Sequence, residues 1–191
     1  KPKRRQKQYT SPEQIDQTKK IIQTAYKLCG EDCEITLDTI DKIYWNKLHD
    51  KSTQYSDFAI YDTFKDFEKF TECAMKICVQ TENKEIAKQI AESIDSCDYL
   101  PFSDIPWYKF SSATATKEHS IKILSEKLNI KIEEIVAFGD DFNDIGMLKL
   151  CGTGVAMQNA IPQVKEIADV ITKTNNDDGV AKYIEENILN N

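Results

Sequence analysis

Apolar residues recur in a regular order beyond residue 112. Thr116 can cap a helix whose apolar positions Ile121, Leu124 and Leu128 are spaced i, i+3 and i+7. Short apolar runs and further helical segments then follow in turn. The expected elements are the helix 116–128, the strand 135–138, the helix 143–150, the strand 154–157, the helix 162–168, the strand 169–172 and the helix 180–188. Because strict alternation of strands and helices is typical of a parallel sheet covered by helices, we expect a Rossmann-like α/β core.

The first half of the chain has a less regular pattern. Ser11 as N-cap and Pro12 at the first helical position predict a helix that stops near Gly30. Further expected elements are a strand and a short helix within 34–49, a strand at 75–79, a helix at 85–94 and a strand at 107–110. Such a mixture favours an α+β lobe. We therefore expect two domains, an α+β domain over residues 1–110 and an α/β domain over residues 111–191.

Aromatic residues are frequent in the expected α+β lobe. A stripe with spacings of three runs through Phe58, Tyr61, Phe64, Phe67 and Phe70. We assign this stripe to the hydrophobic core, since such spacing is the ordinary signature of a buried helical face. Trp45 and Trp107 could line a ligand pocket, but we expect them in the core of this lobe as well.

Charge and hydropathy narrow the class of protein. The chain of 191 residues carries 25 basic and 32 acidic residues, a formal net charge of −7. This balance argues against general binding of nucleic acid, which needs clustered Lys and Arg, and favours a small-molecule partner. No apolar run approaches the roughly 20 residues that cross a bilayer. We expect no membrane association and a cytoplasmic location, and we assign no function to the basic residues 1–7.

The six cysteines are too sparse for a disulfide scaffold, and we expect reduced thiols. A structural zinc site is not indicated, because the chain has two histidines and no Cys-x2-Cys pair.

The acidic loop Gly139–Asp144 is the main candidate for chemistry. It follows the apolar run 135–138, and carboxylates at the carboxyl end of a parallel strand lie where open α/β sheets bind ligands. Oxygen ligands of this kind suit a hard cation and a neighbouring phosphate. The other interpretation is a turn and a helix N-cap, with Asn143 or Asp144 as the capping residue.

Two common motifs fail on spacing. A calcium-binding EF-hand loop starting at Asp140 would place Phe142 at the third position and Cys151 at the twelfth, where oxygen ligands are required. A dinucleotide fingerprint starting at Gly152 would place Met157 at the third glycine and would precede a strand instead of following one.

The quoted segments resemble the haloacid dehalogenase superfamily and, within it, the Cof-type phosphatases. The segments that carry the resemblance are Lys117 with its following apolar spacing, Val136 to Asp144, Met147-Leu148, Gly154 to Ala160, Ala168-Asp169 and Asp178 to Ala181. Residues 1–110 then resemble most of the α+β cap domain that these enzymes insert into their core.

The resemblance implies roles for individual residues. Asp140 would coordinate Mg²⁺, and Asp144 would support the ion directly or through water. Asn143 and Asn159 would bind the substrate, and Lys117, 23 residues before Asp140, would offset negative charge on the transferring phosphoryl group. One departure from the family is Glu118, which stands where these enzymes usually have glycine. We expect its side chain to point outward.

The resemblance also implies a nucleophile that this sequence does not contain. The superfamily attacks phosphate with an aspartate of an Asp-x-Asp-x-Thr segment, and the chain has no such segment. One explanation is an Mg²⁺-dependent phosphatase of a small phosphorylated metabolite whose nucleophile lies outside this chain. The alternative is a non-catalytic module that binds a cation or phosphate and acts in regulation.

Overall fold

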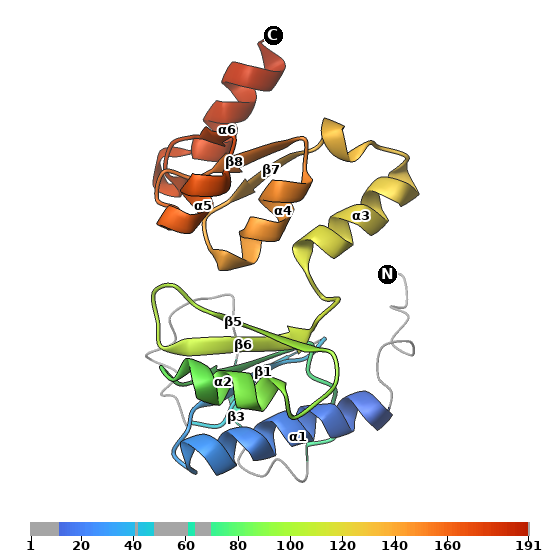
Figure 1. Cartoon of the computed structure of the whole chain (residues 1–191), viewed down its shortest axis with the longest axis vertical. Helices are drawn as coiled ribbons and strands as arrows, with labels where there is room; N and C mark the ends of the chain where they lie inside the picture. Colours follow the sequence, from blue (N-terminus) through green and yellow to red (C-terminus); the bar gives the residue numbers. More distant parts are fainter. Residues whose placement is uncertain (1–11, 41, 48–60, 64–69, 191) are drawn as a thin grey trace. The chain divides into compact units, whose positions relative to one another are not determined.

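The computed structural model describes residues 12–40, 42–47, 61–63 and 70–190, which form two compact units (Figure 1). Unit 1 comprises residues 1–101 and 105–113, and unit 2 comprises residues 102–104 and 114–191. Each unit has its own hydrophobic core. The expected Ser11 cap and the basic N-terminus lie outside the described residues.

Unit 1 is a six-stranded sheet with two helices. The strand order is β3-β2-β1-β4-β6-β5, in which only the β2–β3 pair is parallel. The strands are β1 (Ile35–Asp38), β2 (Ile43–Trp45), β3 (Tyr61–Thr63), β4 (Lys76–Gln80), β5 (Cys97–Pro101) and β6 (Trp107–Ser112), and the helices are α1 (Pro12–Cys29) and α2 (Lys84–Ala91). Helices and a mainly antiparallel sheet in one unit make an α+β lobe, as the sequence predicted.

Alternation along the strands gives the sheet of unit 1 two different faces. The side chains on one face of the sheet pack with both helices in a hydrophobic core. This core includes Ile22, Ala25, Ile35, Leu37, Val79, Ile90 and Phe110. The other face carries Trp45 and Trp107, which are half-buried and meet edge to face with ring centroids 6.1 Å apart. The tryptophans therefore lie on the sheet face away from the helices, and their assignment to the core of this lobe was wrong.

The short helix expected within residues 34–49 is wrong for the described part of that range, which forms β1 and β2. Asn46 closes this strand pair with its side-chain amide, which accepts from the Ile35 N–H at 2.9 Å and donates to the Cys33 carbonyl at 2.7 Å. Of the aromatic stripe, only Phe70 has a described side chain, and it is buried in the core with 7% exposure. The other four aromatic side chains lie outside the described set.

Unit 2 is a parallel three-stranded sheet in the order β7-β8-β9. Its strands are β7 (Val136–Gly139), β8 (Thr153–Ala156) and β9 (Val170–Ile171), and its main helices are α3 (Lys117–Leu128), α4 (Ile145–Leu150), α5 (Pro162–Ile167) and α6 (Gly179–Ile184). A 3₁₀ turn, η4 (Phe142–Asp144), precedes α4, and a π-helical turn, η6 (Glu185–Leu189), continues α6. The alternation of strands and helices predicted for this half is confirmed.

The core of unit 2 lies between β7, β8, α4 and α5 and includes Ala137, Leu148, Ala156 and Val164. Helix α3 contributes less, because Leu124 and Leu128 are 55% and 57% exposed and Ser125 is the buried residue of this helix. Within the described residues β7 is an edge strand, so the strand that leads into the acidic loop has one unpaired side.

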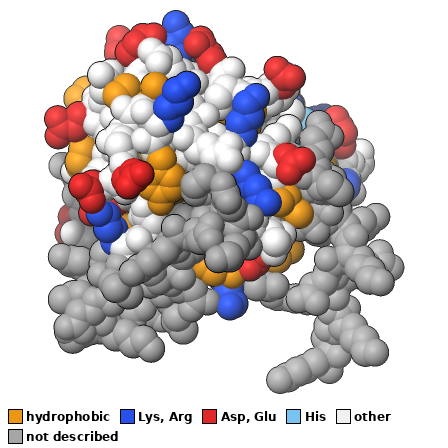
Figure 2. Space-filling view, turned by 90° about the horizontal axis from the view of Figure 1, so that it is seen from below, with side chains coloured by type: hydrophobic (Ala, Val, Ile, Leu, Met, Phe, Trp, Pro, Cys, Tyr) orange, Lys and Arg blue, Asp and Glu red, His pale blue; other side chains and the backbone are white. Residues whose placement is uncertain are grey.

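Charged side chains of both signs are interspersed on the face of the molecule shown in Figure 2. All six cysteines are free thiols, and burial raises the pKa of Cys33 to about 12 and that of Cys97 to about 11. Among the described helices, none has the length and apolar character of a membrane-spanning segment.

Candidate active site

The acidic loop starts where β7 ends. Gly139 is the last residue of β7, and a Cβ added there would lie 2.3 Å from Cβ of Asp144, so only glycine leaves space for the Asp144 side chain to fold back over the strand end. The residue that caps η4 is Asp141, whose carboxylate accepts from the Phe142 N–H at 2.8 Å. Asp144 occupies the N-cap position of α4, one of the two capping residues that the sequence suggested, but its side chain makes no capping hydrogen bond and is left for other contacts.

Asp144 is the buried carboxylate at the centre of the loop, with 4% exposure. Its Oδ2 accepts from the N–H of Asp140 at 2.9 Å and of Asp141 at 3.3 Å, and its Oδ1 pairs with the Lys117 ammonium. Burial alone would raise the pKa of Asp144. The hydrogen bonds from Lys117 and the two N–H groups, with the charge of the ammonium, outweigh burial and lower that pKa below its ordinary value.

Lys117 reaches the loop from the first residue of α3. The helix starts at Thr116, whose hydroxyl oxygen accepts from the His119 N–H at 3.2 Å. Because this cap fixes where the first turn begins, it also fixes the origin of the Lys117 side chain. That side chain is 54% exposed as a whole, and its ammonium pairs with a buried carboxylate 27 residues away.

Asp140 and Asn159 connect the ends of β7 and β8. The Asn159 Nδ2 donates to Asp140 Oδ2 at 3.4 Å, and Asn159 Oδ1 accepts from the Asn175 N–H at 3.0 Å. The Asp140 carbonyl accepts from the Ile161 N–H at 3.0 Å. The three loops that follow β7, β8 and β9 are thus joined at the carboxyl ends of these parallel strands. Asn175 was not among the predicted residues, and no sequence signal marks it, since it contributes only a backbone N–H.

The structure brings four of the five predicted site residues into one bonded cluster: Lys117, Asp140, Asp144 and Asn159. Asn143 is half-buried in η4, between the two aspartates of the cluster in sequence.

Glu118 does not point outward, so that expectation was wrong. Its carboxyl group lies against Gly146 in α4, where an added Cβ would come within 2.6 Å of the carboxyl carbon. The missing Cβ of Gly146 therefore makes the space that the Glu118 side chain fills between α3 and α4.

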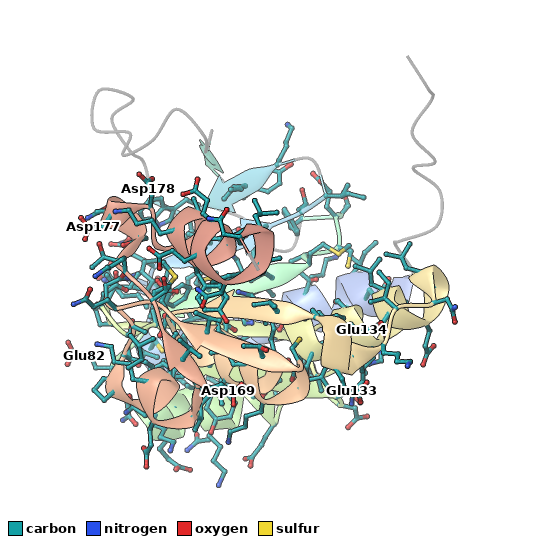
Figure 3. All side chains as sticks on the ribbon, turned by 90° about the horizontal axis from the view of Figure 1, so that it is seen from above. Glu82, Glu133, Glu134, Asp169, Asp177 and Asp178 are labelled. Carbon is teal, nitrogen blue, oxygen red and sulfur yellow. The ribbon has the colours of Figure 1, made fainter. Side chains whose placement is uncertain are left out.

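Other acidic residues lie outside the cluster, and some of them accept hydrogen bonds within unit 2. Figure 3 labels several, of which Glu133 and Glu134 lie beside α3 and Asp177 and Asp178 lie before α6. Asp169 accepts from the Gly154 N–H at 2.7 Å, and Asp177 accepts from the Thr174 hydroxyl at 2.6 Å. In the part of the chain that the structure describes, no three His, Cys, Asp or Glu side chains converge as a metal site. The two carboxylates of the cluster nevertheless fit Mg²⁺, which is commonly held by one or two carboxylates with water and substrate oxygens as the other ligands.

Comparison with known proteins agrees with this geometry. The sequence pattern of the haloacid dehalogenase-like hydrolases matches residues 3–184, almost the whole chain. The chain belongs to this family. The expected Cof-type resemblance and the Rossmann-like fold class are confirmed.

Individual haloacid dehalogenase-like proteins match over different lengths. The putative phosphatase YxeH of Bacillus subtilis is 30% identical over 161 residues, 75% of this chain and 58% of that protein. The 5-amino-6-(5-phospho-D-ribitylamino)uracil phosphatase YcsE of the same organism is 49% identical over 73 residues, 38% of this chain and 29% of that protein. The crystal structure of TM0651 from Thermotoga maritima superposes with a TM-score of 0.67 at 28% identity, over 90% of this chain and 66% of that one. The chain thus spans only part of the length of its curated relatives.

Proposed function

We propose that the chain is part of an Mg²⁺-dependent phosphatase that acts on a small phosphorylated metabolite through an aspartyl-phosphate. The nucleophilic aspartate of this proposal lies outside the chain. The observation that carries it is the pairing of Lys117 with buried Asp144 at the end of β7, next to Asp140. This arrangement supports the proposal, because phosphoryl transfer is stabilised by a positioned ammonium group and by oxygen ligands that suit a hard cation.

Each residue of the cluster has a distinct part in the proposal. The exposed half of Lys117 leaves its ammonium accessible to the oxygens of a bound phosphate, where it offsets negative charge. Asp144 holds that ammonium in position and stays ionised at neutral pH because its pKa is lowered. Asn159 orients the Asp140 carboxylate through its 3.4 Å hydrogen bond. Asn143 is proposed to donate to the phosphate or to the groups next to it.

Asp140 and Asp144 are the residues that would hold Mg²⁺. Asp144 already uses both of its oxygens for Lys117 and backbone N–H groups, so Asp140 is the better direct ligand and Asp144 supports the ion through water or by exchanging a partner. A bound Mg²⁺ supplies charge that neutralises and polarises phosphate oxygens.

Unit 1 is proposed to act as the cap domain that selects the substrate, and the protein is proposed to work in the cytoplasm. In this family such a lobe covers the leaving group. Its sheet face with Trp45 and Trp107 offers aromatic surface for a substrate.

The deciding experiment uses the protein encoded by the longest reading frame that contains this chain. Hydrolysis of an aryl phosphate is measured with and without Mg²⁺, for that protein and for its Asp140→Ala variant. We expect Mg²⁺-dependent turnover that falls at least a hundredfold in the variant. The matched control is Asp16→Ala on α1, which removes an exposed carboxylate and should leave turnover unchanged.

A second candidate is a non-catalytic binding module, in which Lys117, Asp140 and Asp144 hold a cation or phosphate without a nucleophile. Under this alternative the longest form binds Mg²⁺ at Asp140, seen by calorimetry, yet hydrolyses no phosphate ester. That result would rule out the phosphatase proposal.

A further inference from the structure

A pocket of about 650 Å³ opens at the edge of the unit 2 sheet formed by β9. Its lining comes from β9 and the residues after it, from α5, and from the end of α6 with η6. None of the lining residues belongs to the cluster of Lys117, Asp140, Asp144 and Asn159. The pocket is therefore a second candidate site, and its volume falls in the range of small-molecule sites.

Two ammonium groups give the pocket its charge. Lys165 of α5 and Lys173 after β9 both line it. Neither pairs with a carboxylate in the described part of the chain, although acidic residues outnumber basic ones overall. The carboxylate in the lining is Glu186 of η6, so the pocket keeps a positive formal charge on a protein whose total charge is −7.

The backbone that carries Lys173 is held in place from two sides. Its carbonyl accepts from the Gln158 N–H at 3.3 Å and lies 2.2 Å from where a Cβ of Gly179 would be, so only glycine permits this approach. The neighbouring Thr172 hydroxyl donates to the Gly179 carbonyl at 2.8 Å. The wall of the pocket is thus preorganised and does not need to form around a ligand.

Apolar groups make up the rest of the wall. Val170 and Ile171 of β9 are 40% and 53% exposed. The ring of Tyr183 packs edge to face on Phe138, with centroids 5.4 Å apart, which fixes its orientation in the pocket. Gln158 and Asn187 also line the pocket, and the Asn187 amide donates to the Tyr183 carbonyl at 3.0 Å, which helps to fix the wall.

We propose that this pocket binds a small organic dianion with an aromatic or aliphatic body. The anionic group is held by Lys165 and Lys173, and the body packs on Val170, Ile171 and Tyr183. Two ammonium groups favour a phosphate- or phosphonate-like group over a single carboxylate. The site is independent of the proposed phosphatase chemistry.

The test is a titration followed by the backbone amide NMR spectrum of the whole chain, without divalent cations. The probe is phenylphosphonate, which has both an aromatic body and a dianion. Methylphosphonate lacks the body, and benzyl alcohol lacks the charge. We expect saturable shifts at the amides of Ile171, Thr172 and Lys173 with phenylphosphonate, and at least fivefold weaker binding of the other two compounds.

Two double variants separate local contacts from overall charge. The double variant that combines Lys165→Gln and Lys173→Gln should bind phenylphosphonate at least fivefold more weakly, since both charged contacts are lost. The control variant combines Lys122→Gln and Lys149→Gln, which make the same change in charge at exposed positions of α3 and α4. Its affinity for phenylphosphonate should stay within twofold of the wild-type value.

Several results would overturn the proposal. They are the absence of saturable shifts, equal binding of the three compounds, unchanged affinity in the Lys165 and Lys173 variant, and shifts confined to residues 140–144. Shifts at β9 that depend on protein concentration without any probe would also overturn it, because they would show a second copy of the chain covering this edge.

Discussion

At the scale of single residues, Asp144 shows how a carboxylate stays charged in a nearly closed environment. It is 4% exposed, and its two oxygens receive donors from α3 and from the loop itself. Losing a charged donor leaves such a carboxylate with its burial penalty and only backbone partners. The pairing with Lys117 is therefore important for the stability of unit 2 as well as for the proposed chemistry.

Replacing Lys117 with Met tests the contribution to stability. The variant keeps most of the side-chain volume and removes the ammonium. We expect the free energy of unfolding to fall by about 1–2 kcal/mol, less than for a fully buried pair because Lys117 is half exposed. Urea denaturation measures the change, and Lys149→Met on α4 is the control, with an expected change within about 0.5 kcal/mol. Equal effects of the two substitutions would contradict the role of the pair.

The same two proteins give a pH prediction. The pKa of Asp144 is lowered in the folded state, so its contribution to stability is present above the unfolded-state pKa of about 3.9 and is lost as the pH falls through the folded-state pKa. The difference in unfolding free energy between the wild type and Lys117→Met should therefore be constant from about pH 7 to 5 and shrink below about pH 4. Denaturation series at several pH values measure it. A difference that does not vary with pH would show that Asp144 is not the partner that matters.

Spacing along the chain made the cluster predictable, whereas residue type alone did not show which acidic side chain of the loop makes the capping hydrogen bond. The resemblance placed Lys117 by its distance of 23 residues from Asp140, and the structure brings it to Asp144 of the same loop. Residue type did not single out the side chain that makes the capping hydrogen bond, because the loop holds three aspartates and an asparagine, each of which is a good N-cap by type. Only the backbone path, which turns Asp144 back over Gly139, distinguishes Asp141 from the others.

At the scale of elements, the contact between α3 and α4 depends on one glycine and one long side chain. The Glu118 carboxyl group occupies the place where Gly146 has no Cβ. Glycine within a helix costs about 1 kcal/mol relative to alanine, so Gly146 is retained at some cost to α4. The two positions should therefore be coupled.

A double-mutant cycle measures this coupling. Gly146→Ala alone should change stability little, because the gain in helix propensity is offset by displacement of Glu118. In a Glu118→Ala background the same substitution should stabilise the protein by about 0.5–1 kcal/mol. Thermal or urea unfolding of the four proteins gives the coupling energy. Strict additivity would mean that Glu118 moves aside without cost and does not fill the space.

Element prediction succeeded where the pattern was long and failed where it was short. Helices α1 and α3 have apolar positions at helical spacing over several turns, and both were predicted. Strand β2 is three residues long, too short to show a period, and was taken as part of a helix. Strand β5 was not predicted because its sequence, Cys-Asp-Tyr-Leu-Pro, does not alternate between apolar and polar residues.

At the scale of the whole molecule, the two cores differ in how completely they are covered. Unit 1 encloses its core between a six-stranded sheet and two helices. Unit 2 has a three-stranded sheet with β7 at its edge, and large apolar side chains of α3 and the following turn remain exposed: Ile123, Leu124, Leu128 and Ile130. Exposed apolar side chains and an unpaired strand each favour association. Periodicity along the sequence could not predict this exposure, because it indicates an apolar face without showing what covers it.

Leu124 and Leu128 allow this exposure to be tested. Replacing both with Lys removes apolar surface that is already more than half exposed, so the free energy of unfolding should change by less than about 1 kcal/mol. The added lysines bring the net charge nearer to zero, which by itself promotes association. We therefore expect the variant to associate less than the wild type in sedimentation velocity at matched concentrations. Such a decrease would come from the lost apolar contact and not from the change in charge. The control adds the same charge at Gln23 and Gln89, exposed positions of α1 and α2, and should associate at least as strongly as the wild type. If the Leu124 and Leu128 variant associates as the wild type does, the exposed face of α3 is not the contact surface.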